Sequence, residues 1–167
     1  MSLITDELLK CLWERAQAQS GDERASAKLW SYLWNKHFFA EREWVVSPET
    51  PQEGHGRRRV DMTIEYFGGD RQLAVLAFHE AKLNAGPQDV QDAERQAFDA
   101  CMRYLGEHTE LDFVYAFTSF GTEGKAWRCD RHGDYLTPLF GSDDLAGRAQ
   151  YVELHSSEAG LRKVIRS

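Results

Sequence analysis

The stretch LAVLAFHEAKL, residues 73–83, joins a run of apolar side chains to two charged ones. Its first part is typical of a β-strand that is buried on both faces. Alternation along a strand places Glu80 and Lys82, two residues apart, on the same face. Because a buried charge costs free energy unless it is neutralised, the two charges are expected to neutralise each other or to serve a function.

The segments around this stretch predict a sheet that is built mostly from hairpins. RRRVDMTIEYF, residues 57–67, alternates as a strand does, and Gly68-Gly69-Asp70 supplies a turn into residues 73–83. A short strand is expected over 43–47 and a buried one over 111–120. Two helices, the first capped by Thr5 and the second over about 23–39, precede these strands. Short strands and a terminal helix are expected after residue 120.

A further helix is predicted from Gly86-Pro87 to about Leu105. Its apolar stripe runs from Val90 through Ala97 to Cys101, and this stripe is expected to pack on the sheet. Arg95 and Arg103 lie on the far side and are expected to be exposed to solvent.

Together these elements predict one α/β (α+β) domain over residues 1–167, in the order α-α-β-β-β-α-β-β-(β)-α. An N-terminal helix occupies 1–22, the core 23–120, and C-terminal strands and a helix 121–167. A chain of 167 residues with 42% hydrophobic content can bury a core without disulfides or structural metals.

Composition also excludes some classes of protein. No segment approaches the roughly 20 apolar residues of a membrane span, so no membrane partner is expected. The N-terminus lacks the layout of a signal peptide. Cys11, Cys101 and Cys129 form no CxxC pair, which favours reduced thiols and an intracellular location, cytoplasm or nucleus.

Charge bears on whether nucleic acid is a partner. A formal net charge of −7 counts against binding through a broad basic surface. Arg57, Arg58 and Arg59 form the one dense basic cluster, either a local phosphate contact or a solvated loop.

The predicted hairpin brings two carboxylates together. If its turn centres between Asp70 and Arg71, residues whose numbers sum to 141 lie opposite each other, so Asp61 faces Glu80. Opposed β-carbons are about 4.5–5.5 Å apart, and two carboxylates that close repel unless a cation lies between them. Mg²⁺ or Mn²⁺ fits this pair of oxygen donors. The alternative is a plain ion pair of Lys82 near a sheet edge.

Asp61 and the later Glu80-Ala81-Lys82 resemble the D…ExK signature of the PD-(D/E)XK nuclease superfamily, which has the restriction-endonuclease-like fold. The resemblance covers roughly 23–120, and the chain is also similar to small nuclease-like domains of fungal proteins. Two features depart from the family pattern: Val60 replaces the Pro before the Asp, and Ala100 stands where some members carry a Tyr.

The resemblance implies a Mg²⁺-dependent nuclease acting on DNA in preference to RNA. Asp61, Glu80 and the main-chain carbonyl of Ala81 would hold the ion, and Lys82 would orient the attacking water. The resemblance also implies a further acidic ligand, for which Glu49 is preferred over Glu41 and Glu43. It places Gln96 near the site.

Nucleic acid is therefore the expected partner, through Arg57, Arg58, Arg59 and Gln96, and a homodimer is left open. The rival function is a catalytically inactive module of the same fold that binds protein or nucleic acid. A zinc-protease HExxH pattern at His79-Glu80 is excluded, because Leu83 stands where the second His must be.

Overall fold

The structure, a computed structural model, describes residues 2–18, 23–48, 62–82, 86–139 and 151–155. Within these ranges one seven-stranded mixed sheet has the order β1-β2-β3-β4-β5-β6, and β7 also pairs with β5. The strands are β1 (Trp44–Pro48), β2 (Met62–Phe67), β3 (Leu73–Lys82), β4 (Phe113–Phe120), β5 (Glu123–Asp130), β6 (Thr137–Pro138) and β7 (Val152–Glu153). The predicted mixed helix and strand class is confirmed, whereas the terminal helix falls outside the described residues.

β3 occupies the middle of the sheet. It pairs antiparallel with β2 and parallel with β4. A parallel pair needs a long crossover, which α3 (Pro87–Glu107) provides. β4 then returns through a tight turn into antiparallel β5. The prediction that the first part of the stretch 73–83 is buried on both faces is wrong, because residues 73 and 74 are exposed and 75 and 76 are half-buried. The buried part is 77–81.

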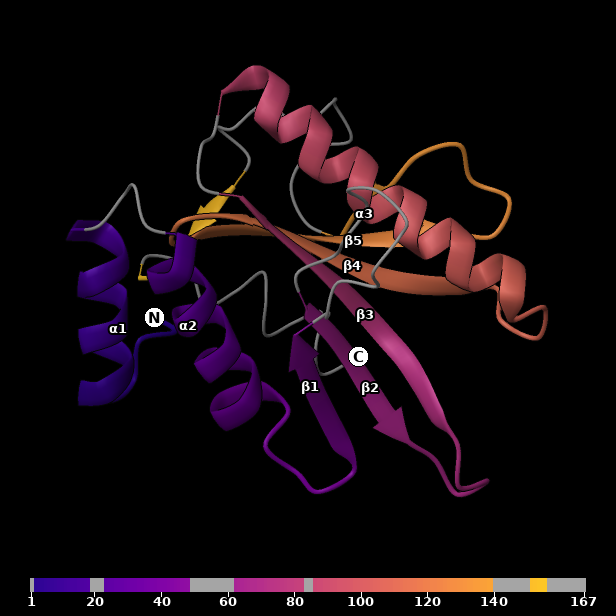
Figure 1. The fold of residues 1–167 in the computed structure, drawn as a ribbon, viewed down its shortest axis with the longest axis horizontal. Helices are drawn as coiled ribbons and strands as arrows, with labels where there is room; N and C mark the ends of the chain where they lie inside the picture. Colours follow the sequence, from indigo (N-terminus) through magenta and orange to yellow (C-terminus); the bar gives the residue numbers. More distant parts are fainter. Residues whose placement is uncertain (1, 19–22, 49–61, 83–85, 140–150, 156–167) are drawn as a thin grey trace.

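The helices form layers on the two faces of the sheet (Figure 1). α1 (Glu7–Ala18), α2 (Glu23–Leu33) and the π-helical turn η1 (Trp34–Phe38) pack on one face around Leu29, Trp30 and Trp34. α3 covers the other face with Ala97, Cys101 and Leu105. Among the described residues, no helix combines the length and apolar character needed to cross a membrane.

The cap of the first helix differs from the prediction. Asp6 rather than Thr5 is the N-cap, because its Oδ1 accepts the N–H of Leu9 at 2.7 Å. A carboxylate at this position satisfies a free amide of the first turn and also interacts favourably with the helix dipole.

A β-bulge in β3 changes which side chains share a face. Ile64 pairs with Ala77, but Glu65 pairs with Val75, so Leu76 is the extra residue. Leu76 therefore packs towards α1 and α2, whereas Val75 and Phe78 pack towards α3. Leu76 and Phe78 thus lie on opposite faces although they are two residues apart.

The start of β5 has a glycine, Gly124, next to the ring of Trp30. A Cβ at Gly124 would lie 2.6 Å from Cη2 of Trp30. The indole is only 1% exposed, and its Nε1–H donates to the carbonyl oxygen of Gly121 at 2.9 Å, so it has little freedom to move. We expect Gly124→Ala to lower the free energy of unfolding by about 1–3 kcal/mol in urea titrations.

Gly106→Ala in the last turns of α3 is the matched control. A Cβ there meets no atom within 4 Å, and alanine favours a helix. That variant should be stabilised by about 0.5–1 kcal/mol. Equal effects of the two substitutions would contradict the role assigned to Trp30.

Candidate active site

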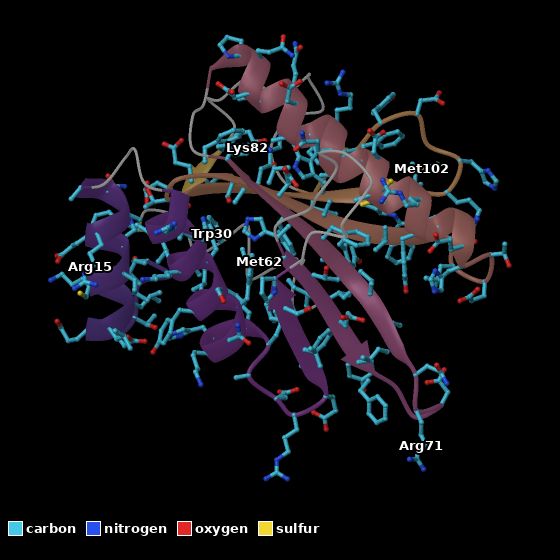
Figure 2. The ribbon with its side chains drawn as sticks, in the orientation of Figure 1. Arg15, Trp30, Met62, Arg71, Lys82 and Met102 are labelled. Atoms are coloured by element: carbon cyan, nitrogen blue, oxygen red, sulfur yellow. The ribbon has the colours of Figure 1, made fainter. Side chains whose placement is uncertain are left out.

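Glu80 and Lys82 lie near the C-terminal end of β3, in the part of the strand that pairs with β4. Lys82 Nζ is 2.7 Å from Glu80 Oε1, which confirms that the two side chains share a face. The Glu80 side chain is 1% exposed and that of Lys82 31%. Figure 2 shows Lys82 at the end of β3 towards the start of α3, and Arg71 at the opposite end. A buried carboxylate is thus joined to a lysine that reaches solvent.

The location of this pair separates it from an ordinary surface ion pair. β3 lies between β2 and β4 in the sheet, and Glu80 pairs with Thr118 of β4, one residue beyond His79, whose partner in β2 is Met62. An exposed pair contributes about 0–1 kcal/mol, whereas burying a carboxylate carries a desolvation cost that its partner often fails to offset. Stability alone therefore gives little reason for a glutamate at this position.

The predicted partner of Glu80 is Asp61, which lies outside the described residues, as do Glu49, Arg57, Arg58 and Arg59. The register next to it is described. Met62 pairs with His79 and Ile64 with Ala77, and both pairs sum to 141 as predicted. The pairing of Asp61 with Glu80 remains a prediction.

Glu41 and Glu43 lie at the wrong end of the sheet to act as the further acidic ligand. The carbonyl oxygen of Glu43 accepts the N–H of Phe67, and Phe67 pairs with Leu73 at the start of β3. Leu73 is seven residues from Glu80, or about 23 Å along the strand.

The predicted phase of α3 is confirmed. Its residues Val90, Ala97 and Cys101 are buried, and Arg95 and Arg103 are exposed. The helix begins at Pro87, where the N–H of the preceding Gly86 donates to the Asp89 carboxylate at 3.1 Å.

Glu94, rather than Gln96, lies on the side of α3 that faces the sheet. It lies four residues after Val90, within the buried stripe, and its Oε1 accepts the Tyr151 hydroxyl proton at 3.0 Å. Gln96 is half-buried and stands about 200° further around the helix, on nearly the opposite side. Its assignment to nucleic-acid contact remains a prediction.

A polar cluster that the sequence did not predict surrounds Glu94 on this face. Thr118 Oγ1 lies 2.7 Å from the Tyr151 hydroxyl and accepts the Trp127 Nε1–H at 2.9 Å. Lys125 Nζ lies 4.3 Å from the Trp127 ring centroid, and the residue is 1% exposed. The cluster therefore contains a buried lysine and a half-buried glutamate beside the strand that carries Glu80.

Burial shifts the pKa values of both charged members of the cluster. Desolvation raises the pKa of Glu94, and the Tyr151 hydrogen bond and the charge of Lys125 only partly oppose it. Desolvation lowers the pKa of Lys125, against the opposing charge of Glu94. The sequence could have indicated a buried polar role for Glu94, because it is a charged residue within the apolar stripe of a helix.

His79 belongs to the other face of the sheet and is not a metal ligand candidate. The Trp34 Nε1–H donates to its Nδ1 at 2.8 Å, and its Nε2 lies 2.7 Å from Ser119 Oγ. Burial lowers the pKa of His79 to about 3, so the imidazole is neutral.

The described residues supply only part of what a divalent ion needs. Within them no three His, Cys, Asp or Glu side chains gather at one point, and Cys11, Cys101 and Cys129 are free thiols. The chemistry at the end of β3 nevertheless fits a hard cation, since Glu80 and the Ala81 carbonyl both offer oxygen donors. The remaining predicted ligands lie outside the described residues.

Comparisons with known proteins add no relative. No family model matches the chain, and no curated protein or solved structure matches it.

Proposed function

We propose that this protein is a Mg²⁺-dependent nuclease that hydrolyses phosphodiester bonds in DNA rather than RNA, with a restriction-endonuclease-like core. The observation that carries the proposal is the buried Glu80 paired with Lys82 on the central strand. The order of helix, three antiparallel strands, crossover helix and parallel strand supports it.

The proposed roles follow from the resemblance and, for Glu80 and Lys82, also from the contact between their side chains. Asp61, Glu80 and the Ala81 carbonyl would hold the ion, with Glu49 as a further ligand. A bound Mg²⁺ lowers the pKa of a coordinated water and neutralises charge on the phosphate. Lys82 is partly exposed, so its ammonium group can leave Glu80 to orient water and stabilise negative charge on the phosphate.

The substrate contacts are proposed on separate grounds. Because the protein has a formal net charge of −7, attraction to phosphate has to be local. Arg57, Arg58 and Arg59 precede Asp61 in the sequence and would supply this attraction, together with Gln96.

Mn²⁺ binding tests the proposal directly. In crystals soaked with Mn²⁺ we expect anomalous density beside the Glu80 carboxylate. In solution, Mn²⁺ at 100 times its Kd should stabilise the folded state by about 2.7 kcal/mol. Glu80→Gln should lose most of this stabilisation, whereas Glu107→Gln at the distal end of α3 should keep it. Density elsewhere, or equal stabilisation of the two variants, would remove Glu80 from the site.

A second candidate function, a non-catalytic binding module, is favoured by a groove on the opposite face. Its volume is about 690 Å³, and its described lining combines apolar Leu12 and Met62 with Lys28 and Lys36 from α2 and η1. Such a groove suits a partner with an apolar ridge and acidic flanks. This function replaces the first if the wild type neither binds Mn²⁺ nor cleaves DNA or RNA.

A further inference from the structure

A chain of hydrogen bonds ends on Glu94 on the face of the sheet that α3 covers. The Trp127 Nε1–H donates to Thr118 Oγ1, and the Tyr151 O–H donates to Glu94 Oε1. The Tyr151 hydroxyl proton is directed to Glu94. The Tyr151 hydroxyl oxygen therefore accepts the hydroxyl proton of Thr118, whose Oγ1 lies 2.7 Å away. Every donor in the chain therefore points towards the Glu94 carboxylate.

This chain is adjacent to the Glu80 position. Glu80 pairs with Thr118 of β4, and Thr118 pairs with Lys125 of β5, so the three residues form a row across neighbouring strands. Neighbouring strands lie about 4.8 Å apart, so these residues are direct neighbours in the sheet. Glu94 reaches the same row from α3 through Tyr151.

This patch holds two carboxylates, and each has a lysine charge near it. Glu80 is paired with Lys82, and the charge of Lys125 acts on Glu94. The hydrogen bond to Glu94 comes from a neutral hydroxyl, which fixes the direction of the carboxylate without adding a charge to it. A purely structural chain could end on an amide or a carbonyl with less desolvation cost.

We propose that Glu94 is a positioning residue of the same site, whose carboxylate accepts hydrogen bonds from water molecules bound to the divalent ion. This inference rests on the proposed function. Tyr151 and Thr118 hold the Glu94 carboxylate, and the charge of Lys125 balances it when no ion is bound. Residues that orient the groups around an ion typically affect its affinity by roughly 10- to 100-fold.

Mn²⁺ affinity, measured by calorimetric titration, tests this role without reference to cleavage. Glu94→Gln keeps the size of the side chain and an acceptor for Tyr151 but removes the charge, and it should raise the Kd for Mn²⁺ roughly 10- to 100-fold. Tyr151→Phe keeps the ring packed on Phe120 but removes the hydroxyl, and it should raise the Kd by a smaller factor. Glu107→Gln, an exposed residue of the same helix, should leave the Kd unchanged.

The outcomes separate the two proposals. If Glu80→Gln weakens Mn²⁺ binding while Glu94→Gln and Tyr151→Phe bind as the wild type does, this inference is overturned and the proposed function stands. If the wild type binds no Mn²⁺, both are overturned. Should Glu94→Gln fail to fold, Tyr151→Phe decides, and an unchanged Kd in that variant overturns the role of Glu94.

Discussion

Glu80→Gln is expected to abolish Mg²⁺-dependent cleavage while the domain stays folded. The substituted amide would keep the shape of the buried side chain but lose the charge that holds a divalent ion. It also leaves Lys82 near its present place, where the ammonium group already reaches solvent. Cleavage of plasmid DNA with and without Mg²⁺, and the circular dichroism spectrum of each variant, measure the two effects.

Lys82→Met is expected to separate metal binding from catalysis. The apolar stem stays, Glu80 keeps its charge, and Mn²⁺ should still stabilise the fold. Cleavage should fall by about 10²- to 10³-fold, the usual effect of removing one group that stabilises transition-state charge. If Lys82→Met cleaves as well as the wild type, Lys82 has no catalytic role.

The same two variants should differ in stability when no metal is present. Lys82→Met takes a partner from a buried carboxylate, whereas Glu80→Gln takes one from a partly exposed lysine. The loss in Lys82→Met should be about 1–3 kcal/mol, below the range for two fully buried partners because Lys82 reaches water. Arg95→Met, which breaks a solvent-exposed pair with Asp92, should cost less than about 1 kcal/mol.

The register near Glu80 was predicted correctly for a reason that was only partly right. The assumed turn centre, between Asp70 and Arg71, predicts that the residue numbers of each opposed pair sum to 141. Near the turn the pairs sum to 140, as in Phe67 with Leu73. The bulge at Leu76 adds one residue and restores 141 at Met62 and His79. Alternation in sequence does not reveal a bulge, because a run of apolar residues fits either register.

Local signals were sufficient for the helices and the central strand, whereas the polar cluster depends on contacts between distant parts of the chain. Val90, Ala97 and Cys101 lie at helical spacing, and this spacing alone gave the phase of α3. Glu94 and Tyr151 are 57 residues apart in the sequence. Only the folded arrangement of α3 with the segment before β7 brings them together.

The buried imidazole of His79 should make the fold sensitive to acid. Trp30, Trp34 and Phe117 surround the ring. Because the Trp34 N–H donates to Nδ1, that nitrogen must be unprotonated, and Nε2 carries the proton donated to Ser119. A protonated His79 would carry a proton on Nδ1, so two hydrogen-bond donors, Nδ1–H and the Trp34 N–H, would face each other in the core.

The direction of the effect follows from the two pKa values of His79. Burial lowers the pKa in the folded state to about 3, while the unfolded chain has the ordinary value of 6.5. Between these values the unfolded state binds a proton that the folded state does not. Stability is therefore full above pH 6.5 and falls as the pH decreases, by about 1.4 kcal/mol per unit.

Urea unfolding at pH 7.5 and 5.0 measures this effect. His79 should account for about 2 kcal/mol of the stability that the wild type loses between the two conditions. His79→Gln does not titrate in this range, so its loss should be smaller by that amount, whatever its stability at pH 7.5. Exposed His132 provides the control, since His132→Gln should keep the pH dependence of the wild type. Equal pH dependence in His79→Gln and the wild type would mean that His79 is protonated in the folded protein, and that its bond from Trp34 does not persist in solution.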